Sequence, residues 1–210
     1  EEVLPSFAPA VGAGAGGQEW EVPRFLRTAK RAALSPMERG TAMHALMQHL
    51  DFAEVPDIAA IERQARSLFD QGILTEEAYQ SLDVRNVWRF VSSALGRRLR
   101  EAKRVYRELP FGRLLPAKKY YKEAQDEADR IFLQGIIDVL FEEENGDYIL
   151  LDYKTDRHIS PQDARTRYQF QIDLYCDAVE TILGRPVKEC YLFLLDTGRE
   201  VRMERQAASA

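Results

Sequence analysis

The sequence predicts an α/β domain with a helical first half and a sheet in its second half. Residues 136–141 and 148–153 are rich in β-branched, aromatic and aliphatic side chains, and turn residues separate them, which is typical of a β-hairpin. Residues 165–183 carry apolar side chains at three- and four-residue steps, which predicts an amphipathic helix. With 210 residues, of which 45% are hydrophobic, the chain can bury the core of one domain.

The first part of the chain is expected to hold a tether followed by helices. Residues 1–19 are rich in alanine and glycine and lack periodicity, so we expect a flexible tether there. The domain then spans residues 20–210, with a mainly helical part at 20–105 and a sheet-containing core at 106–210. Periodic apolar side chains predict helices at residues 36–49, 58–72 and 75–107.

The composition excludes several classes of protein. No apolar run reaches membrane-spanning length, and the first residues lack a start Met and the basic and apolar regions of a signal peptide. We therefore expect a piece of a larger cytoplasmic protein. Cys176 and Cys190 lack the spacing of a metal site and cannot build a four-cysteine cluster, so we expect ordinary core thiols.

The charge of the chain is unevenly distributed. A net charge of −5 argues mildly against a free-standing nucleic-acid binder, since phosphate contacts need Lys and Arg. Residues 85–107, however, hold eight basic residues and one acidic residue. This segment is either a solvated surface or a track for DNA phosphates. The candidate DNA-binding residues in it are Arg97, Arg98, Lys103 and Arg104.

The register of the hairpin decides where its carboxylates point. Asp138 and Asp152 interrupt apolar strands, and ionised carboxylates in such places need a compensating charge, which a divalent cation would supply. Residues two apart on a strand share a face, so Asp152 and Lys154 project together. A two-residue Asn-Gly turn would send Asp138 to the other face. We predict instead a three-residue loop with Gly146 left-handed, which sets Asp138 opposite Asp152.

Further strands are expected on both sides of this hairpin, at residues 106–115, 187–195 and 201–203. Glu108 lies within the first of them, where it would either approach a metal or form a structural ion pair. The loop that follows mixes lysines with Tyr120 and Tyr121, which suits single-stranded nucleic acid and solvent equally.

A histidine and a glutamine–tyrosine pair are further candidates for a site. His44 lies beside the apolar stripe of the first helix, where a lone histidine is usually a core residue, but with the two aspartates it completes a metal-binding set. Gln171 and Tyr175 lie one helical turn apart and share a face, a pattern that more often serves packing than function. His49 and His158 lack such partners and are expected at the surface.

Taken in order, these motifs resemble the PD-(D/E)XK nuclease family, and in particular its RecB-type branch. The matching motifs are Gly40-Thr41-x-x-His44, Gly135-Ile136-Ile137-Asp138, Asp152-Tyr153-Lys154-Thr155 and Tyr168-x-x-Gln171-x-x-x-Tyr175. The resemblance covers roughly residues 36–195. It implies a restriction-endonuclease-like core, with a mixed sheet and elements in the order α-β-β-β-α-β, next to an N-terminal helical region.

The resemblance also implies roles for the matching residues. The implied metal ligands are His44, Asp138, Asp152 and the carbonyl of Tyr153. The implied catalytic residues are Asp138, Asp152, Lys154, Gln171 and Tyr175. Apart from these, Glu108 and Tyr168 are candidate accessory residues. The expected cation is Mg²⁺, with Mn²⁺ tolerated. No iron–sulfur cluster is expected, because the four cysteines of cluster-containing relatives are missing.

By the same resemblance, the chain would be a nuclease that prefers single-stranded DNA and belongs to a helicase–nuclease complex processing double-strand breaks for recombinational repair. The implied partners are DNA, a helicase domain in the same chain and an AddB-like subunit. Two alternatives stay open: a catalytically inactive DNA-binding or assembly domain of this fold, and a metal-dependent enzyme for another phosphate or carbonyl substrate. Intact Asp138, Asp152 and Lys154 argue against the first, and the lack of a phosphate-binding glycine loop argues against nucleotide hydrolysis.

Overall fold

The computed structural model describes residues 34–119, 126 and 128–205. Two predictions, the tether at residues 1–19 and the tyrosines Tyr120 and Tyr121, lie outside the described residues. The chain divides into two compact units, residues 1–33 and Leu34–Ala210, and the second unit is described below. Among the described helices, none combines the length and apolar character that a membrane span requires.

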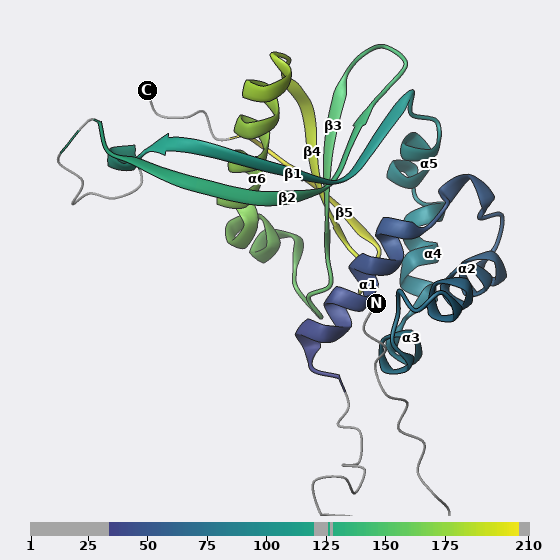
Figure 1. Cartoon of the computed structure of the whole chain (residues 1–210). Helices are drawn as coiled ribbons and strands as arrows, with labels where there is room; N and C mark the ends of the chain where they lie inside the picture. The colour runs from purple at the N-terminus through teal and green to yellow at the C-terminus, as the bar shows by residue number, and fades with distance from the viewer. Residues whose placement is uncertain (1–33, 120–125, 127, 206–210) are drawn as a thin grey trace, which may run out of the picture. The chain divides into compact units, whose positions relative to one another are not determined.

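In the described part of the chain, five α-helices precede the sheet (Figure 1). They are α1 (Pro36–His49), α2 (Ile58–Asp70), α3 (Glu76–Ser81), α4 (Val84–Ser92) and α5 (Ala94–Arg100). The first two agree with prediction, but the single helix predicted over residues 75–107 is wrong. The side chains of Asp83 and Ser93 each accept a hydrogen bond from a backbone N–H ahead of them, so each begins a new helix. The chain is already a strand at Arg104.

The five described strands form one mixed sheet in the order β1-β2-β3-β4-β5. They are β1 (Arg104–Pro116), β2 (Arg130–Glu142), β3 (Tyr148–Lys154), β4 (Val187–Leu194) and β5 (Arg199–Met203). Helix α6 (Pro161–Leu183) joins the parallel pair β3 and β4, and the other neighbours are antiparallel. The predicted mixed sheet and element order are confirmed. Helix α6 begins one turn earlier than predicted because Ser160 caps it and Pro161 suits its first turn.

Helices cover both faces of this sheet (Figure 1). On one face, Ile149, Leu151 and Tyr153 of β3 pack among buried residues of α1, α2, α4 and α5. On the other face, Leu150 of β3 and Leu192 of β4 pack against α6. The central strands are therefore buried on both sides, which explains their continuous apolar sequences.

Strands β2 and β3 form the predicted hairpin in the predicted register. A backbone hydrogen bond of 3.0 Å closes the three-residue loop, and Gly146 has a φ of +86°. The regular ladder ends where Val139 lies opposite Leu151. The next positions in the same register are Asp138 and Asp152, so the two carboxylates stand at the end of the paired segment.

Beyond this point β1 and β2 continue together as a two-stranded arm, residues 109–116 and 130–137, which projects away from β3 (Figure 1). One face of the arm packs toward α6, where the ring of Phe111 lies edge-on to Tyr175 with centroids 5.5 Å apart. The sheet thus forks at Asp138, with the arm on one side and β3 on the other.

Candidate active site

Helix α1 brings His44 to the end of β3. A capping box starts the helix, and Leu46 and Met47 bury its apolar face in the core. Gly40 permits the close approach, because a Cβ atom at this position would lie 2.9 Å from the Oγ1 atom of Thr155, directly after β3. His44 follows one turn later and reaches the fork of the sheet.

The strands are distorted where they carry Glu108 and Asp138. Glu108 has a φ of +48°, which is uncommon for a residue other than glycine, and the pairing of β1 with β2 skips Glu108 and Asp138. Ile137 packs in the layer of α6 but Val139 packs in the layer of α1, although residues two apart on a regular strand share a face. The alternation of β2 therefore switches at Asp138. Strained backbone of this kind is concentrated at functional sites.

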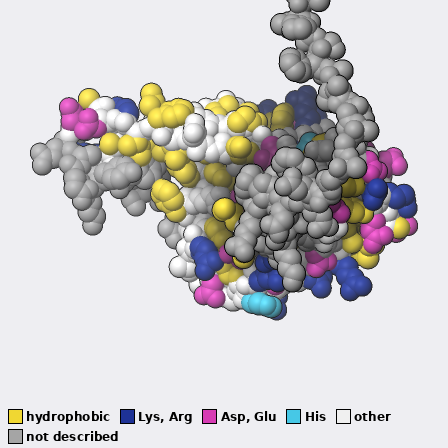
Figure 2. Space-filling view, turned by 60° about the horizontal axis from the view of Figure 1, so that its bottom comes forward, with side chains coloured by type: hydrophobic (Ala, Val, Ile, Leu, Met, Phe, Trp, Pro, Cys, Tyr) yellow, Lys and Arg dark blue, Asp and Glu magenta, His cyan; other side chains and the backbone are white. Residues whose placement is uncertain are grey.

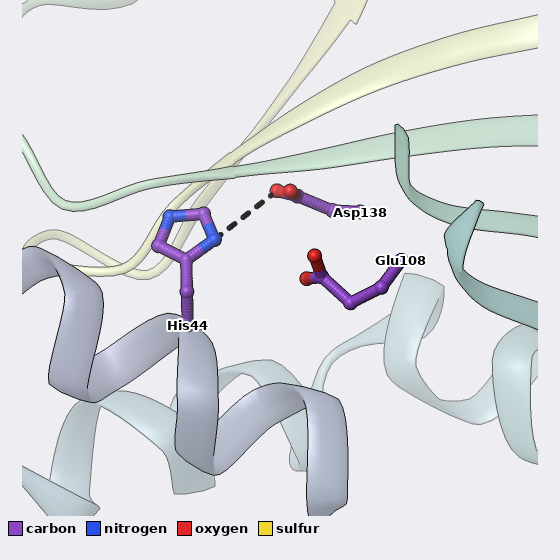
Figure 3. Close-up of side chains that lie close together, drawn as sticks. All are labelled: His44, Glu108 and Asp138. Carbon is purple, nitrogen blue, oxygen red and sulfur yellow. Dashed lines mark ion pairs between the residues drawn. The ribbon is translucent and has the colours of Figure 1, made fainter. Parts of the chain in front are cut away.

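His44, Glu108 and Asp138 converge at this distortion (Figure 3). The Nδ1 atom of His44 lies 3.5 Å from Oδ2 of Asp138, and one ligand atom from each of the three residues lies within 4.8 Å of the other two. The same Oδ2 atom accepts a 2.7 Å hydrogen bond from the backbone N–H of Tyr153. The predicted approach of His44 to Asp138 is confirmed. Glu108 lies in the same cluster, and its role as a metal ligand stays a prediction.

Asp152 and Lys154 form an ion pair beside this cluster. The Nζ atom of Lys154 lies 2.7 Å from Oδ2 of Asp152, donates a 2.8 Å hydrogen bond to Oε1 of Gln171, and sits 4.0 Å from the ring centroid of Tyr168. Gln171 in turn donates to the hydroxyl of Tyr175 at 2.7 Å. Helix α6 therefore holds the lysine in place through the residues that the sequence had singled out.

Burial and the proximity of other carboxylates disfavour the ionised form of two carboxyl groups in the site. Burial, followed by the charge of Asp138, raises the pKa of Asp152 to about 6. Burial and the same aspartate also raise the pKa of Glu108. Burial opposes protonation of His44, but its hydrogen bond to Asp138 and the nearby carboxylates raise its pKa nevertheless.

This donor set suits a hard divalent cation. His44 offers one imidazole nitrogen, Glu108 and Asp138 offer carboxylate oxygens, and Asp152 stands next to them. The buried Oδ2 atom of Asp152 accepts no hydrogen bond within the described residues, although Lys154 is close. A bound cation would relieve the repulsion among the carboxylates, so the residues present fit Mg²⁺ or Mn²⁺. The three-residue group contains Glu108 where the sequence had suggested Asp152.

The predicted basic residues do not lie along one helix, and their contact with DNA stays a prediction. The four residues are Arg97, Arg98, Lys103 and Arg104, which are spread over α5, the turn after it and β1. Arg98 pairs with Glu143 at 2.8 Å and Glu189 at 2.7 Å. Lys103 and Arg104 both pair with Glu142, at 3.2 and 3.9 Å. Three of the four cations therefore pair with carboxylates of the same domain.

The two cysteines and the two other histidines have the burial that the sequence predicted. Cys176 and Cys190 are buried between α6 and β4 with their sulfur atoms 2.8 Å apart, and His49 and His158 are exposed. Sequence reasoning did not single out Asp156, whose Oδ2 atom accepts a 2.6 Å hydrogen bond from the Tyr168 hydroxyl. Its position two residues after Lys154 was the only local sign that it belongs to this region.

A mixed sheet that forks at paired carboxylates, with an Asp-x-Lys strand and a histidine from the preceding helix, is the arrangement expected of the nuclease class to which the motifs pointed. A sequence model of the PD-(D/E)XK nuclease superfamily matches residues 19–210. The chain belongs to this superfamily.

Several named proteins are similar in sequence to this chain. The chain is 44% identical over 188 residues to AddA, the A subunit of the ATP-dependent helicase/nuclease, from Heliobacterium modesticaldum, and 40% identical over 186 residues to that from Ruminiclostridium cellulolyticum. Each alignment covers 86% of this chain but 13% or 14% of the relative, so the chain spans about one seventh of the length of these proteins. One solved structure, described as the crystal structure of SSO0001, overlaps 82% of this chain and 79% of its own at a TM-score of 0.39 and 12% identity, too distant a likeness to support an inference.

Proposed function

We propose that this domain is a divalent-metal-dependent DNA nuclease that hydrolyses phosphodiester bonds, preferably in single-stranded DNA. The observation that carries the proposal is the convergence of His44, Glu108 and Asp138 within 4.8 Å, beside a buried pair of Asp152 and Lys154. The cluster provides a cation site, and the lysine provides a fixed positive charge next to it.

The proposed ligands are His44, Glu108 and Asp138, with Asp152 and the carbonyl of Tyr153 completing the site. When bound there, Mg²⁺ or Mn²⁺ would supply Lewis acidity at the scissile phosphate and make an attacking water more acidic. The protein contributes the geometry: the Tyr153 N–H fixes one oxygen of Asp138, and the distorted backbone at Glu108 aims a second carboxylate at the same point.

Lys154 is the proposed charge-stabilising residue. The oxygens of a phosphate gain negative charge as the attacking water adds, and a preorganised ammonium beside them lowers the energy of that transition state. Asp152, Gln171 and the ring of Tyr168 hold Nζ from three directions, so little reorganisation is needed when the substrate binds. Tyr175 fixes the amide of Gln171 and is a positioning residue.

The complete protein is proposed to be a helicase–nuclease that processes DNA double-strand breaks for recombinational repair in the cytoplasm, with a helicase portion in the same polypeptide and an AddB-like partner. The support is the similarity to the AddA proteins, of which this chain spans a small part. The net charge of −5 gives the isolated chain weak long-range attraction for a polyanion, so we expect low activity until the remainder of the protein delivers the strand.

The test is a titration of Mg²⁺, Mn²⁺ and Ca²⁺ against cleavage of single- and double-stranded oligonucleotides by the 210-residue chain. We expect cleavage with Mg²⁺ or Mn²⁺, faster on single strands, and none with Ca²⁺ or EDTA. Asp152→Ala, purified in the same way, should lose both Mg²⁺ binding by calorimetry and cleavage, and it controls for contaminating nuclease. Oligonucleotide binding without cleavage in any metal would instead identify an inactive DNA-binding domain.

A further inference from the structure

The outer face of the arm carries an uncharged, largely apolar strip. Its members are Pro110, Gly112 and Leu114 of β1 and Phe132, Gln134 and Ile136 of β2, which lie opposite one another in the ladder. Leu114 is 66% exposed, Phe132 65% and Ile136 51%. Hydrophobic side chains can be followed along the arm in Figure 2. Leu114 and Phe132 are cross-strand neighbours, and exposed apolar side chains that are grouped in this way mark a binding surface more often than single scattered ones do.

The strip begins at the candidate metal site. Pro110 and Ile136 are cross-strand neighbours, and each lies two positions from Glu108 and Asp138 respectively. From Asp138 to Phe132 the strand advances by roughly 20 Å, the length of a few nucleotides. A polymer whose phosphate sits at the cluster and whose chain runs toward the arm must therefore pass along this strip.

The chemistry of the strip favours bases over phosphates. None of its six residues is charged, so it offers no positive charge to neutralise the phosphate backbone that a duplex presents. A single strand exposes its bases, which gain by stacking on aromatic and apolar side chains. Gly112 leaves room for the ring of Phe132 to lie over the backbone of β1, since a Cβ atom there would be 3.0 Å from Cζ of that ring. The ring therefore lies against the backbone of β1 and remains exposed to solvent.

We propose that this strip binds the bases of single-stranded DNA next to the cleaved phosphodiester, with Phe132 as the stacking residue and Ile136 as the contact nearest the site. The inference rests on the proposed function, because it takes the cluster of His44, Glu108 and Asp138 as the place of the scissile phosphate. It adds a physical reason for a preference for single strands: paired bases cannot reach the strip.

The test compares Phe132→Ala and Ile136→Ser with Ile182→Ser, a matched control that removes a 60% exposed apolar side chain from α6. Steady-state cleavage of a single-stranded oligonucleotide should show a KM raised at least about fivefold by Phe132→Ala, with kcat within about twofold of wild type. Ile182→Ser should leave both values unchanged. An oligonucleotide with abasic sites flanking the cleaved bond should raise the wild-type KM similarly and add no further penalty to Phe132→Ala.

Binding of a fluorescein-labelled oligonucleotide in Ca²⁺, followed by anisotropy, separates this inference from the proposed function. Weaker binding by Phe132→Ala supports the strip as a DNA-binding surface. If, in addition, no metal ion allows cleavage, the nuclease proposal fails and the strip proposal still stands. Wild-type KM and binding for Phe132→Ala and Ile136→Ser, in preparations where Asp152→Ala is inactive, would overturn the strip and leave the nuclease proposal intact. If Phe132→Ala weakens association with the helicase portion and leaves DNA binding unchanged, the strip is a protein interface, and the strip proposal is likewise overturned.

Discussion

Replacing Asp152 with asparagine tests whether the folded protein stores unfavourable charge that a cation relieves. The residue is 2% exposed and lies near Asp138, so its ionised form is disfavoured in the metal-free protein. Asparagine has nearly the same shape and no charge. We therefore expect Asp152→Asn to stabilise the metal-free domain at neutral pH while removing its response to Mg²⁺.

The size of the effect follows from the pKa of the carboxyl, which burial and Asp138 raise from 3.8 to about 6. The folded carboxyl binds its proton more tightly than the unfolded one, so stability falls as pH rises from about 4 to about 6 and the full cost is present above that range. The difference corresponds to roughly 3 kcal/mol at pH 7.5. For a chain of this size, that is a rise in Tm of about 6–12 °C for Asp152→Asn.

The assay is thermal unfolding in EDTA and in Mg²⁺ at several pH values. The advantage of Asp152→Asn in EDTA should be largest at pH 7.5 and shrink as the pH falls through 6 toward 4, because the wild-type carboxyl then takes up its proton. Mg²⁺ should raise the Tm of wild type only. Glu144→Gln, which removes an exposed carboxylate in the hairpin loop, should behave as wild type. An asparagine variant that is no more stable than wild type in EDTA at pH 7.5 refutes the reasoning.

Three further predictions follow from the contacts of the site and of the basic segment. Lys154→Ala should cleave at least about a hundredfold slower, because one preorganised charge-stabilising group contributes roughly 3 kcal/mol to a transition state, and calorimetry should still detect Mg²⁺ binding. Equal cleavage rates for Lys154→Ala and wild type would remove this role. Gly40→Ala should lower activity by displacing α1, since its Cβ would lie 2.9 Å from Oγ1 of Thr155, and the added change Thr155→Ala should restore it; absence of rescue contradicts the steric explanation. Arg98→Ala should lower the midpoint of urea unfolding, because its two ion pairs hold α5 to the sheet, and should leave oligonucleotide affinity within about twofold of wild type. A selective loss of DNA affinity would instead support Arg98 as part of a phosphate-binding track.

The local chemistry of the sequence was enough to define the hairpin and one half of the site. Loop length and the left-handed Gly146 set the register, and the two-residue period of a strand puts Asp152 and Lys154 on one face. The 3.6-residue period of α6 likewise places Gln171 and Tyr175 together. These relations depend on residues close in the chain, so they can be read from the sequence.

The other half of the site was decided by tertiary structure. Glu108 enters the cluster because its backbone takes a positive φ where the pairing of β1 and β2 is interrupted, and no sequence period reports such a distortion. His44 reaches Asp138 because Gly40 lets α1 approach Thr155 closely, a contact between segments far apart in the chain.

The basic segment, residues 85–107, also depends on tertiary structure for its role. Its composition left a solvated surface and a track for DNA phosphates open, and the structure shows that Arg98 pairs with Glu143 and Glu189, which lie on the hairpin and on β4. Charge is a property of the sequence, whereas the partner that neutralises a charge is selected by packing.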